Sequence, residues 1–211
     1  MRTTHFCAAG MLLSGICAAA ASGQYTGGGI PILDAFDEIS PITVSDLSTV
    51  SSVRLTIFGL THGRAGDLRM LVSHTDSQNV TLDVELCFNA GATPANPVGS
   101  LASLSGDYGF TDTAATTFWD AAVATGTGVV PNGDYHPSAT FNGTTDPLTF
   151  LSSFNGDTAA GRWSLSISDS DPGFQGSISG WQLDINGVPE PAMLAPAILG
   201  IAILPRRRRR R

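Results

Sequence analysis

The sequence predicts an all-β fold, an antiparallel β-sandwich or jelly roll in a single domain, from three observations. Several short segments alternate apolar and polar residues with a period of two, as half-buried strands do. Gly, Asp, Asn or Pro bound each segment, and the chain has 24 Gly and 12 Pro among 211 residues. No long amphipathic helical stretch and no internal repeat occur, which disfavours bundles, solenoids and propellers.

The clearest predicted strand is residues 80–88. Its apolar residues predict a buried face, and its polar residues, with Cys87, predict a wet face. Three further segments predict core positions in the same way: Val53, Leu55 and Ile57; Trp163, Leu165 and Ile167; Trp181, Leu183 and Ile185. Residues 112–124 could form a helical turn, but they are rich in Thr, and we expect a long loop there.

Composition and charge exclude several classes of protein. Hydrophobic residues make up 42% and charged residues 14%, which fits neither a disordered polyelectrolyte nor a polytopic membrane protein. Between residues 24 and 188 there are four Arg and no Lys, against seventeen Asp and Glu. Such an acidic surface repels phosphate backbones, so we expect no nucleic-acid partner.

Residues 1–23 predict a cleavable secretory signal peptide. Arg2 and His5 precede an apolar run, and small residues follow it, with cleavage expected before Gln24. A membrane anchor is the alternative, but the run is rich in Ala and Gly and short for a span. Cleavage would also remove Cys7 and Cys17, so Cys87 would have no partner for an intramolecular disulfide.

The C-terminal segment, residues 188–211, predicts a second targeting signal. Val188, Pro189, Glu190 and Pro191 precede an apolar stretch, residues 192–204, and six Arg from Arg206 and Arg207 to the end. Thirteen helical residues span about 20 Å, short of a hydrocarbon core of about 30 Å. A plain tail anchor is one interpretation, with the Arg cluster in the cytoplasm.

This order of motif, short apolar helix and terminal Arg resembles the PEP-CTERM sorting signal of Gram-negative bacteria. The resemblance implies transient anchoring in the inner membrane, processing by an exosortase, and delivery to the cell envelope or extracellular matrix.

Residues 24–187 resemble a second family. His62, Gly66, Asp67 and Leu68 match the His-x-x-x-Gly-Asp-Leu signature of the P domain (P/Homo B domain) of subtilisin-like proprotein convertases. Trp163 and Asp169, and then Trp181, match that family's closing segments. The chain departs from the family pattern at residues 73–76 and over most of residues 89–150. The resemblance implies a jelly roll of the kind that accompanies a separate serine protease domain.

We expect no catalysis. The chain has no room for a protease domain of about 300 residues beside a β domain, and no Gly-x-Ser-x-Gly elbow. His62, His74 and His136 lack the spacing of zinc ligands. We expect His62 to orient a loop by hydrogen bonding, Arg64 to pair with Asp67, and Cys87 to be inert.

Calcium is the one metal that the charge pattern permits. Asp169 and Asp171 stand beside a Pro-Gly turn, and Asp67 and Asp112 would join them if the loops converge. Alternatively these carboxylates cap turns and keep the domain soluble.

Three functions remain open. The first is a non-catalytic, exported surface or matrix module, and the second is an accessory domain acting in trans with a subtilisin-like protease. The third is a jelly-roll hydrolase or a calcium-dependent carbohydrate-binding or adhesion jelly roll, which needs an exposed aromatic platform or a carboxylate pair about 5 to 10 Å apart. Trp119, Tyr108 and Tyr135 are the candidates for the platform, whereas Trp163 and Trp181 are expected in the core. The sequence names no surface ligand or oligomeric state.

Overall fold

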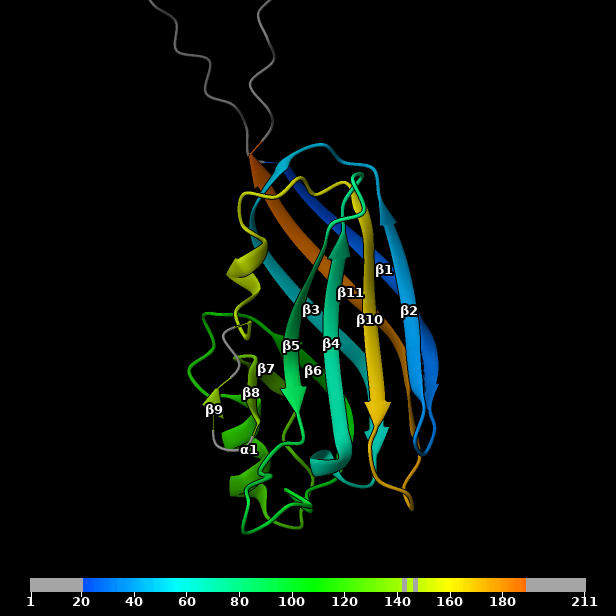
Figure 1. Cartoon of the computed structure of the whole chain (residues 1–211), viewed down its shortest axis with the longest axis vertical. Helices are drawn as coiled ribbons and strands as arrows, with labels where there is room; N and C mark the ends of the chain where they lie inside the picture. The colour runs from blue at the N-terminus through cyan, green and yellow to red at the C-terminus, as the bar shows by residue number, and fades with distance from the viewer. Residues whose placement is uncertain (1–20, 142–143, 146–147, 189–211) are drawn as a thin grey trace, which may run out of the picture.

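The computed structural model describes residues 21–141, 144–145 and 148–188, which form two β-sheets packed face to face (Figure 1). The first sheet has the order β1 (Ala21–Ile32), β11 (Gly176–Val188), β3 (Thr49–His62), β6 (Leu104–Phe110) and β7 (Gly133–Tyr135). The second has the order β2 (Asp37–Val44), β10 (Gly161–Asp169), β4 (Leu68–Thr75), β5 (Thr81–Phe88), β8 (Ser138–Phe141) and β9 (Thr144–Thr145). The predicted β-sandwich is confirmed.

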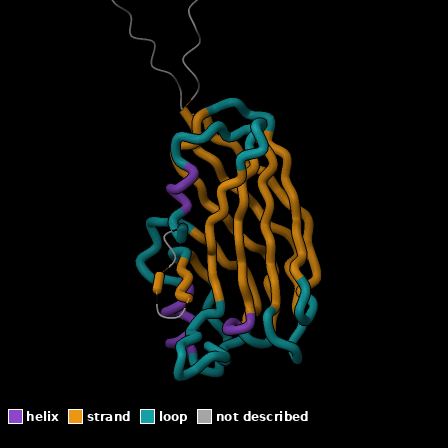
Figure 2. Tube along the Cα trace, viewed as in Figure 1, coloured by secondary structure: helices purple, strands orange, loops and turns teal. Residues whose placement is uncertain are grey.

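Most neighbouring strands pair antiparallel, as predicted, but two pairs do not. β5 pairs parallel with β8, and β6 pairs parallel with β7. Both pairs lie on the side of the sandwich that carries the short helix α1 (Phe118–Thr125), whereas the long strands run the length of the molecule (Figure 2).

The core lies between the sheets and contains the predicted alternating residues of β3, β10 and β11. Trp163 and Trp181 are fully buried, as predicted. Each indole N–H has an acceptor: Trp163 Nε1 donates to the Ala159 carbonyl at 2.9 Å and Trp181 Nε1 to Ser40 Oγ at 3.0 Å. Burial of two large rings with their polar atoms satisfied stabilises the contact between the sheets.

The prediction for residues 80–88 is wrong at both ends. Val80 is exposed and precedes β5, and Glu85 and Cys87 are buried instead of facing water. For Cys87 the cause is an irregularity in the pairing with β4, where Met70 is opposite Cys87 but Leu71 is opposite Glu85. A bulge of this kind shifts the alternation by one residue, so Cys87 turns into the core.

The predicted long loop at residues 112–124 is also wrong, because it contains most of α1. Thr117 caps this helix: its Oγ1 accepts from the Asp120 N–H at 3.0 Å and donates to Asp120 Oδ2 at 2.7 Å. This reciprocal cap stabilises a short helix in spite of its Thr content. Gly126, with φ of 68°, ends it.

The described chain begins with β1 and ends with β11, and these two ends lie side by side at one end of the sandwich (Figure 1). Residues 1–20 of the predicted signal lie outside the described residues, as do Pro189, Glu190, Pro191, Arg206 and Arg207. Strand β1 starts at Ala21, before the expected cleavage point, and Ala21 pairs with Gly187. Within the described residues, no helix has the length and apolar character needed to cross a membrane.

Candidate functional site

The signature residue His62 ends β3 and makes a buried link between the two sheets. Its Nε2 lies 3.1 Å from Oδ2 of Asp169, which ends β10 in the other sheet, and both side chains are 0% exposed. Its Nδ1 lies 2.8 Å from the carbonyl oxygen of Arg64. The ring therefore fixes both the following loop and the opposite sheet, which confirms the predicted loop-orienting role of His62.

Asp67 lies beside this link in the 3₁₀ turn η1 (Ala65–Asp67) and is fully buried. Arg64 Nη1 donates to its Oδ1 at 3.3 Å, which confirms the predicted pair, while Oδ2 has no hydrogen-bond partner among the described residues. Burial raises the pKa of Asp67; Arg64 opposes this shift, and the charges of Asp169 and Asp171 add to it.

Hydrogen bonds from the backbone complete the cluster. The Ser170 N–H and hydroxyl both donate to the Asp67 carbonyl at 2.9 Å, and the Asp171 N–H donates to Asp169 Oδ1 at 3.1 Å. Asp34, which the sequence analysis missed, accepts from the Gly173 N–H at 3.3 Å through Oδ2, and its buried Oδ1 has no partner among the described residues. We call His62, Arg64, Asp67 and Asp169 the sheet latch.

The structure gathers three of the four predicted calcium ligands. Asp67, Asp169 and Asp171 interact electrostatically, but Asp112 lies elsewhere, with its carboxylate accepting the N–H groups of residues 151 and 152 at 2.8 and 2.7 Å. Asp112 follows the part of β6 that pairs with the middle of β3, far along that strand from His62. The described part of the chain has no group of three or more His, Cys, Asp or Glu arranged to hold a metal ion. The predicted grouping with Asp112 is therefore wrong, and calcium binding stays a prediction.

The comparison with protein families adds an independent observation on the region that contains Asp169 of this latch. The family model of the proprotein convertase P-domain matches residues 132–185. That stretch, about a quarter of the chain, contains β7 to β10 and most of β11, with Trp163, Asp169 and Trp181. No curated protein matches the chain.

The P-domain match and the N-terminal signature meet in space. His62, Gly66, Asp67 and Leu68 lie outside the matched stretch, yet β3 pairs with matched β11, and β4, which begins at Leu68, pairs with matched β10. The His62–Asp169 bond joins the two parts directly. The structure therefore places the His62 signature directly beside the matched strands.

Cys87 is a poor nucleophile. Its side chain is fully buried, and burial, with a smaller contribution from Glu85, raises the pKa of the thiol to about 12. The predicted inertness agrees with this pKa, although the expected partial exposure was wrong.

Two of the three residues proposed for an aromatic platform are buried. Tyr108 and Tyr135 pack around Phe118 in the core, and their hydroxyls donate to the carbonyls of Val130 and Pro131 at 2.9 and 2.6 Å. The platform prediction is wrong for both tyrosines. Trp119 alone is partly exposed.

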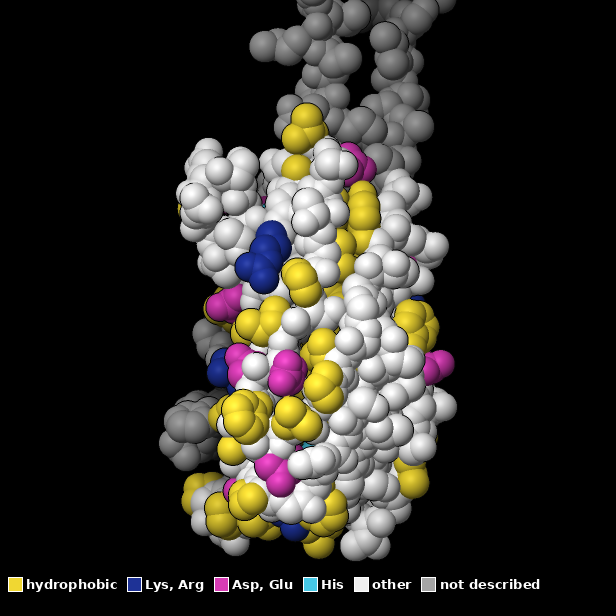
Figure 3. Space-filling model, turned by 90° about the vertical axis from the view of Figure 1, so that its right-hand side faces the viewer, with side chains coloured by type: hydrophobic (Ala, Val, Ile, Leu, Met, Phe, Trp, Pro, Cys, Tyr) yellow, Lys and Arg dark blue, Asp and Glu magenta, His cyan; other side chains and the backbone are white. Residues whose placement is uncertain are grey.

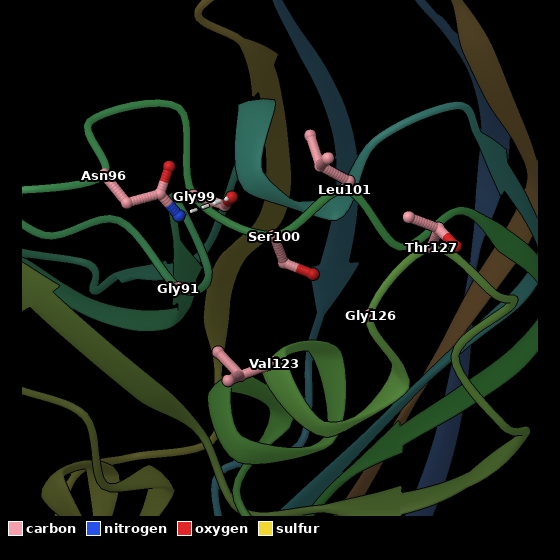
Figure 4. A pocket seen from close by; sticks show the side chains of 8 residues that line it. All are labelled: Gly91, Asn96, Gly99, Ser100, Leu101, Val123, Gly126 and Thr127. Atoms are coloured by element: carbon pink, nitrogen blue, oxygen red, sulfur yellow. Dashed lines mark hydrogen bonds between the residues drawn. The ribbon is translucent and has the colours of Figure 1, made fainter.

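Two grooves lie near α1. The Gly99 groove, of about 250 Å³, lies between residues 91–101 and the C-terminal end of the helix (Figure 4). Leu101 and Val123 line the groove. Asn96 Nδ2 donates to the Gly99 carbonyl at 2.9 Å. A Cβ at Gly99 would lie 2.5 Å from the carbonyl oxygen of Ala90, so only glycine fits there. No charged side chain lines this groove.

The Trp119 groove, of about 360 Å³, lies at the other end of the helix and has more side chains that can bind a ligand. It is lined by aromatic and hydrogen-bonding side chains: Thr117, Trp119, Asp120, His136, Pro137, Ser138, Ala139, Thr149 and Phe150. From the sequence, Trp119 is a platform candidate, whereas most residues around it come from segments that only the fold brings together.

The edge formed by β1 and β2 carries a different surface. Phe36 and Ile39 are exposed there, and small groups of hydrophobic side chains alternate with polar and acidic ones (Figure 3). Dispersed groups of this kind are usual on a protein surface, so we assign no docking site to this edge.

Proposed function

We propose that this chain is a non-catalytic, exported module of the P-domain type, sorted by an exosortase to the cell envelope or the extracellular space. The observation that carries the proposal is the P-domain match at residues 132–185, joined to the His62 signature by the His62–Asp169 bond. The PEP-CTERM resemblance of residues 188–211 supports the route.

The latch is suited to structure rather than to catalysis. His62 and Asp169 are fully buried and bonded to each other, so a substrate would have to displace a bond between the sheets to reach them. Cys87 is buried with a raised pKa. A general base or nucleophile needs access to the reacting atoms, which these groups lack.

The position of Val188 suits removal of the predicted C-terminal sorting signal, whereas cleavage before Gln24 would remove residues 21–23 from the start of β1. Val188 pairs with Thr49 and is the last residue of β11, so a cut after Val188 leaves every described strand complete. Val188 lies at the opposite end of the sandwich from the latch, because it pairs with Thr49 and His62 is at the far end of β3 from Thr49. Processing would therefore leave the latch and both α1 grooves intact.

The test is fractionation of cells that produce the full chain, with and without an exosortase gene. We expect the product in the envelope or medium only when the exosortase is present, and accumulation of the unprocessed chain in the inner membrane when it is absent. A variant that lacks residues 206–211 should behave like the chain without exosortase. Equal distribution in both strains would contradict the sorting proposal.

An accessory role beside a subtilisin-like protease is the second candidate, because the matched family is the P-domain of proprotein convertases. Its test adds the purified full chain to a subtilisin-like protease from the same organism. A longer thermal half-life or a changed peptide preference of the protease would support the role. An unchanged half-life and preference, with no co-purification, would leave only the first candidate.

A further inference from the structure

The Trp119 groove combines two accessible aromatic rings. Trp119 comes from the first turn of α1, and Phe150, which is 48% exposed, comes from the segment before η2 (Leu151–Phe154). The ring of His136 stands edge-on to Phe150, with centroids 5.0 Å apart and planes at 84°. Trp163 and Trp181 are buried, so Trp119 is the accessible tryptophan of the three in the chain. A volume of about 360 Å³ falls within the range of small-ligand sites.

Four hydrogen-bonding positions in the groove have no partner among the described residues. His136 Nδ1 lies 2.7 Å from a backbone carbonyl oxygen and so carries a proton, which leaves Nε2 of the neutral ring as an acceptor. The indole N–H of Trp119 is a free donor. Ser138 Oγ accepts from the Trp119 backbone N–H at 3.1 Å, so its own hydrogen is available. Asp120 uses Oδ2 for the Thr117 hydroxyl and keeps Oδ1 as an acceptor.

We propose that the Trp119 groove binds a neutral sugar residue of a glycan. A sugar hydroxyl both donates and accepts, which suits a wall that offers two donors and two acceptors. The C–H face of a sugar ring packs on an aromatic face, which Trp119 and Phe150 supply.

Other ligand chemistries fit the groove less well. Asp120 is the one charged carboxylate in the lining and no Arg or Lys accompanies it, which disfavours phosphate or uronate groups. An apolar peptide side chain would cover the rings but leave the donors and acceptors unpaired, at a cost in affinity.

The site does not depend on the proposed export or protease roles. His136, Ser138 and Phe150 lie inside the P-domain match, whereas Trp119 and Asp120 lie outside it. The groove therefore joins the matched part to a segment that the family model does not cover.

The experiment uses the purified full chain in a detergent without a sugar head group. Neutral trisaccharides of glucose, galactose, mannose and N-acetylglucosamine are titrated, beside a uronic acid trisaccharide and a proline-rich peptide. We expect at least one neutral trisaccharide to bind saturably by calorimetry and to shield one tryptophan from acrylamide quenching. Absence of saturable binding by all neutral trisaccharides, or binding of the uronate or peptide alone, overturns the proposal.

Variants locate the binding. Trp119→Ala and Phe150→Ala should each lower the affinity about tenfold, equivalent to about 1.4 kcal/mol. Phe150 is largely exposed, so its variant keeps the test valid if loss of Trp119 disturbs α1. Leu101→Ala, in the Gly99 groove, is the matched control and should bind as the parent chain does. Unchanged affinity in a folded Phe150→Ala variant overturns the assignment to this groove.

Discussion

The side chain of His62 joins that of Asp169 across the two sheets, at 3.1 Å and without exposure to solvent. The bond lies at the end of the sandwich opposite Ala21 and Val188, where η1 and the turn after β10 pack together. It ties the N-terminal signature to the matched C-terminal strands, so the stability of the whole domain should depend on it.

Replacing Asp169 with Ala should lower the free energy of unfolding by about 3 kcal/mol, because it leaves His62 buried without its acceptor. Urea unfolding of the full chain measures this. The control is Asp134→Ala, which removes a pair with Arg54 whose side chains are 40% and 50% exposed and should cost less than about 1 kcal/mol. Equal losses in the two variants would contradict the role of the latch.

The Asp67 carboxyl should make stability fall with rising pH. Its folded pKa is raised, mainly by burial, so its contribution is fully present below the ordinary pKa of 3.8 and is lost as the pH rises through the folded pKa. Asp67→Asn cannot ionise, so the melting temperature of the variant minus that of the parent should increase as the pH is raised from about 3.5. A difference that stays constant or decreases with pH would show that the Arg64 pair outweighs burial.

Gly66→Ala should destabilise the chain by about 2 kcal/mol. A Cβ at this position would lie 2.4 Å from the carbonyl oxygen of Val98 and 2.7 Å from the backbone nitrogen of Ser100. Gly28→Ala is the matched control, because a Cβ there meets nothing within 4 Å, and it should change stability by less than about 0.5 kcal/mol. Thermal melting of both variants distinguishes a steric need for glycine from a general intolerance.

Cys87 should resist alkylation in the folded chain. A thiol pKa of about 12 leaves very little thiolate at pH 8, and the side chain is buried. In a chain with Cys7→Ser and Cys17→Ser, iodoacetamide should react at least about a hundredfold more slowly without urea than in concentrated urea. Similar rates in the two conditions would mean that Cys87 is accessible.

Calcium binding can be tested directly at the three gathered carboxylates. If Asp67, Asp169 and Asp171 bind the ion, calcium at about tenfold above its Kd should raise the melting temperature by about 4 °C, and chelator should reverse the rise. Asp171→Asn should remove most of this effect, whereas Asp112→Asn should keep it, since Asp112 lies elsewhere. Identical melting curves with calcium and with chelator would reject the site.

Local patterns predicted part of this molecule well. The alternation in β3, β10 and β11 predicted the core residues correctly, because every second residue of these strands faces inward without interruption. The Arg64–Asp67 ion pair was predictable because the two residues are only three positions apart in the sequence. The phase of β5 depends on its bulge against β4, which no pattern within β5 reveals. The Thr117-x-x-Asp120 cap was a visible signal for α1 that its Thr content obscured.

The parts of the site that depend on tertiary structure were missed. Asp34 accepts the Gly173 N–H from a distant part of the chain, and the Phe150 ring meets that of His136 only in the folded chain. Burial of Tyr108 and Tyr135 also depends on distant partners, which is why the proposed platform reduced to Trp119.

The central claim is that the chain is exported and processed at both ends to leave the P-domain-like sandwich. The most direct measurement is the intact mass of the chain recovered from its native cells. We predict one product that begins close to Gln24 and ends between Val188 and Pro191, found outside the inner membrane. A product that keeps residues 192–211, or one of full mass in the cytoplasm, would contradict the account.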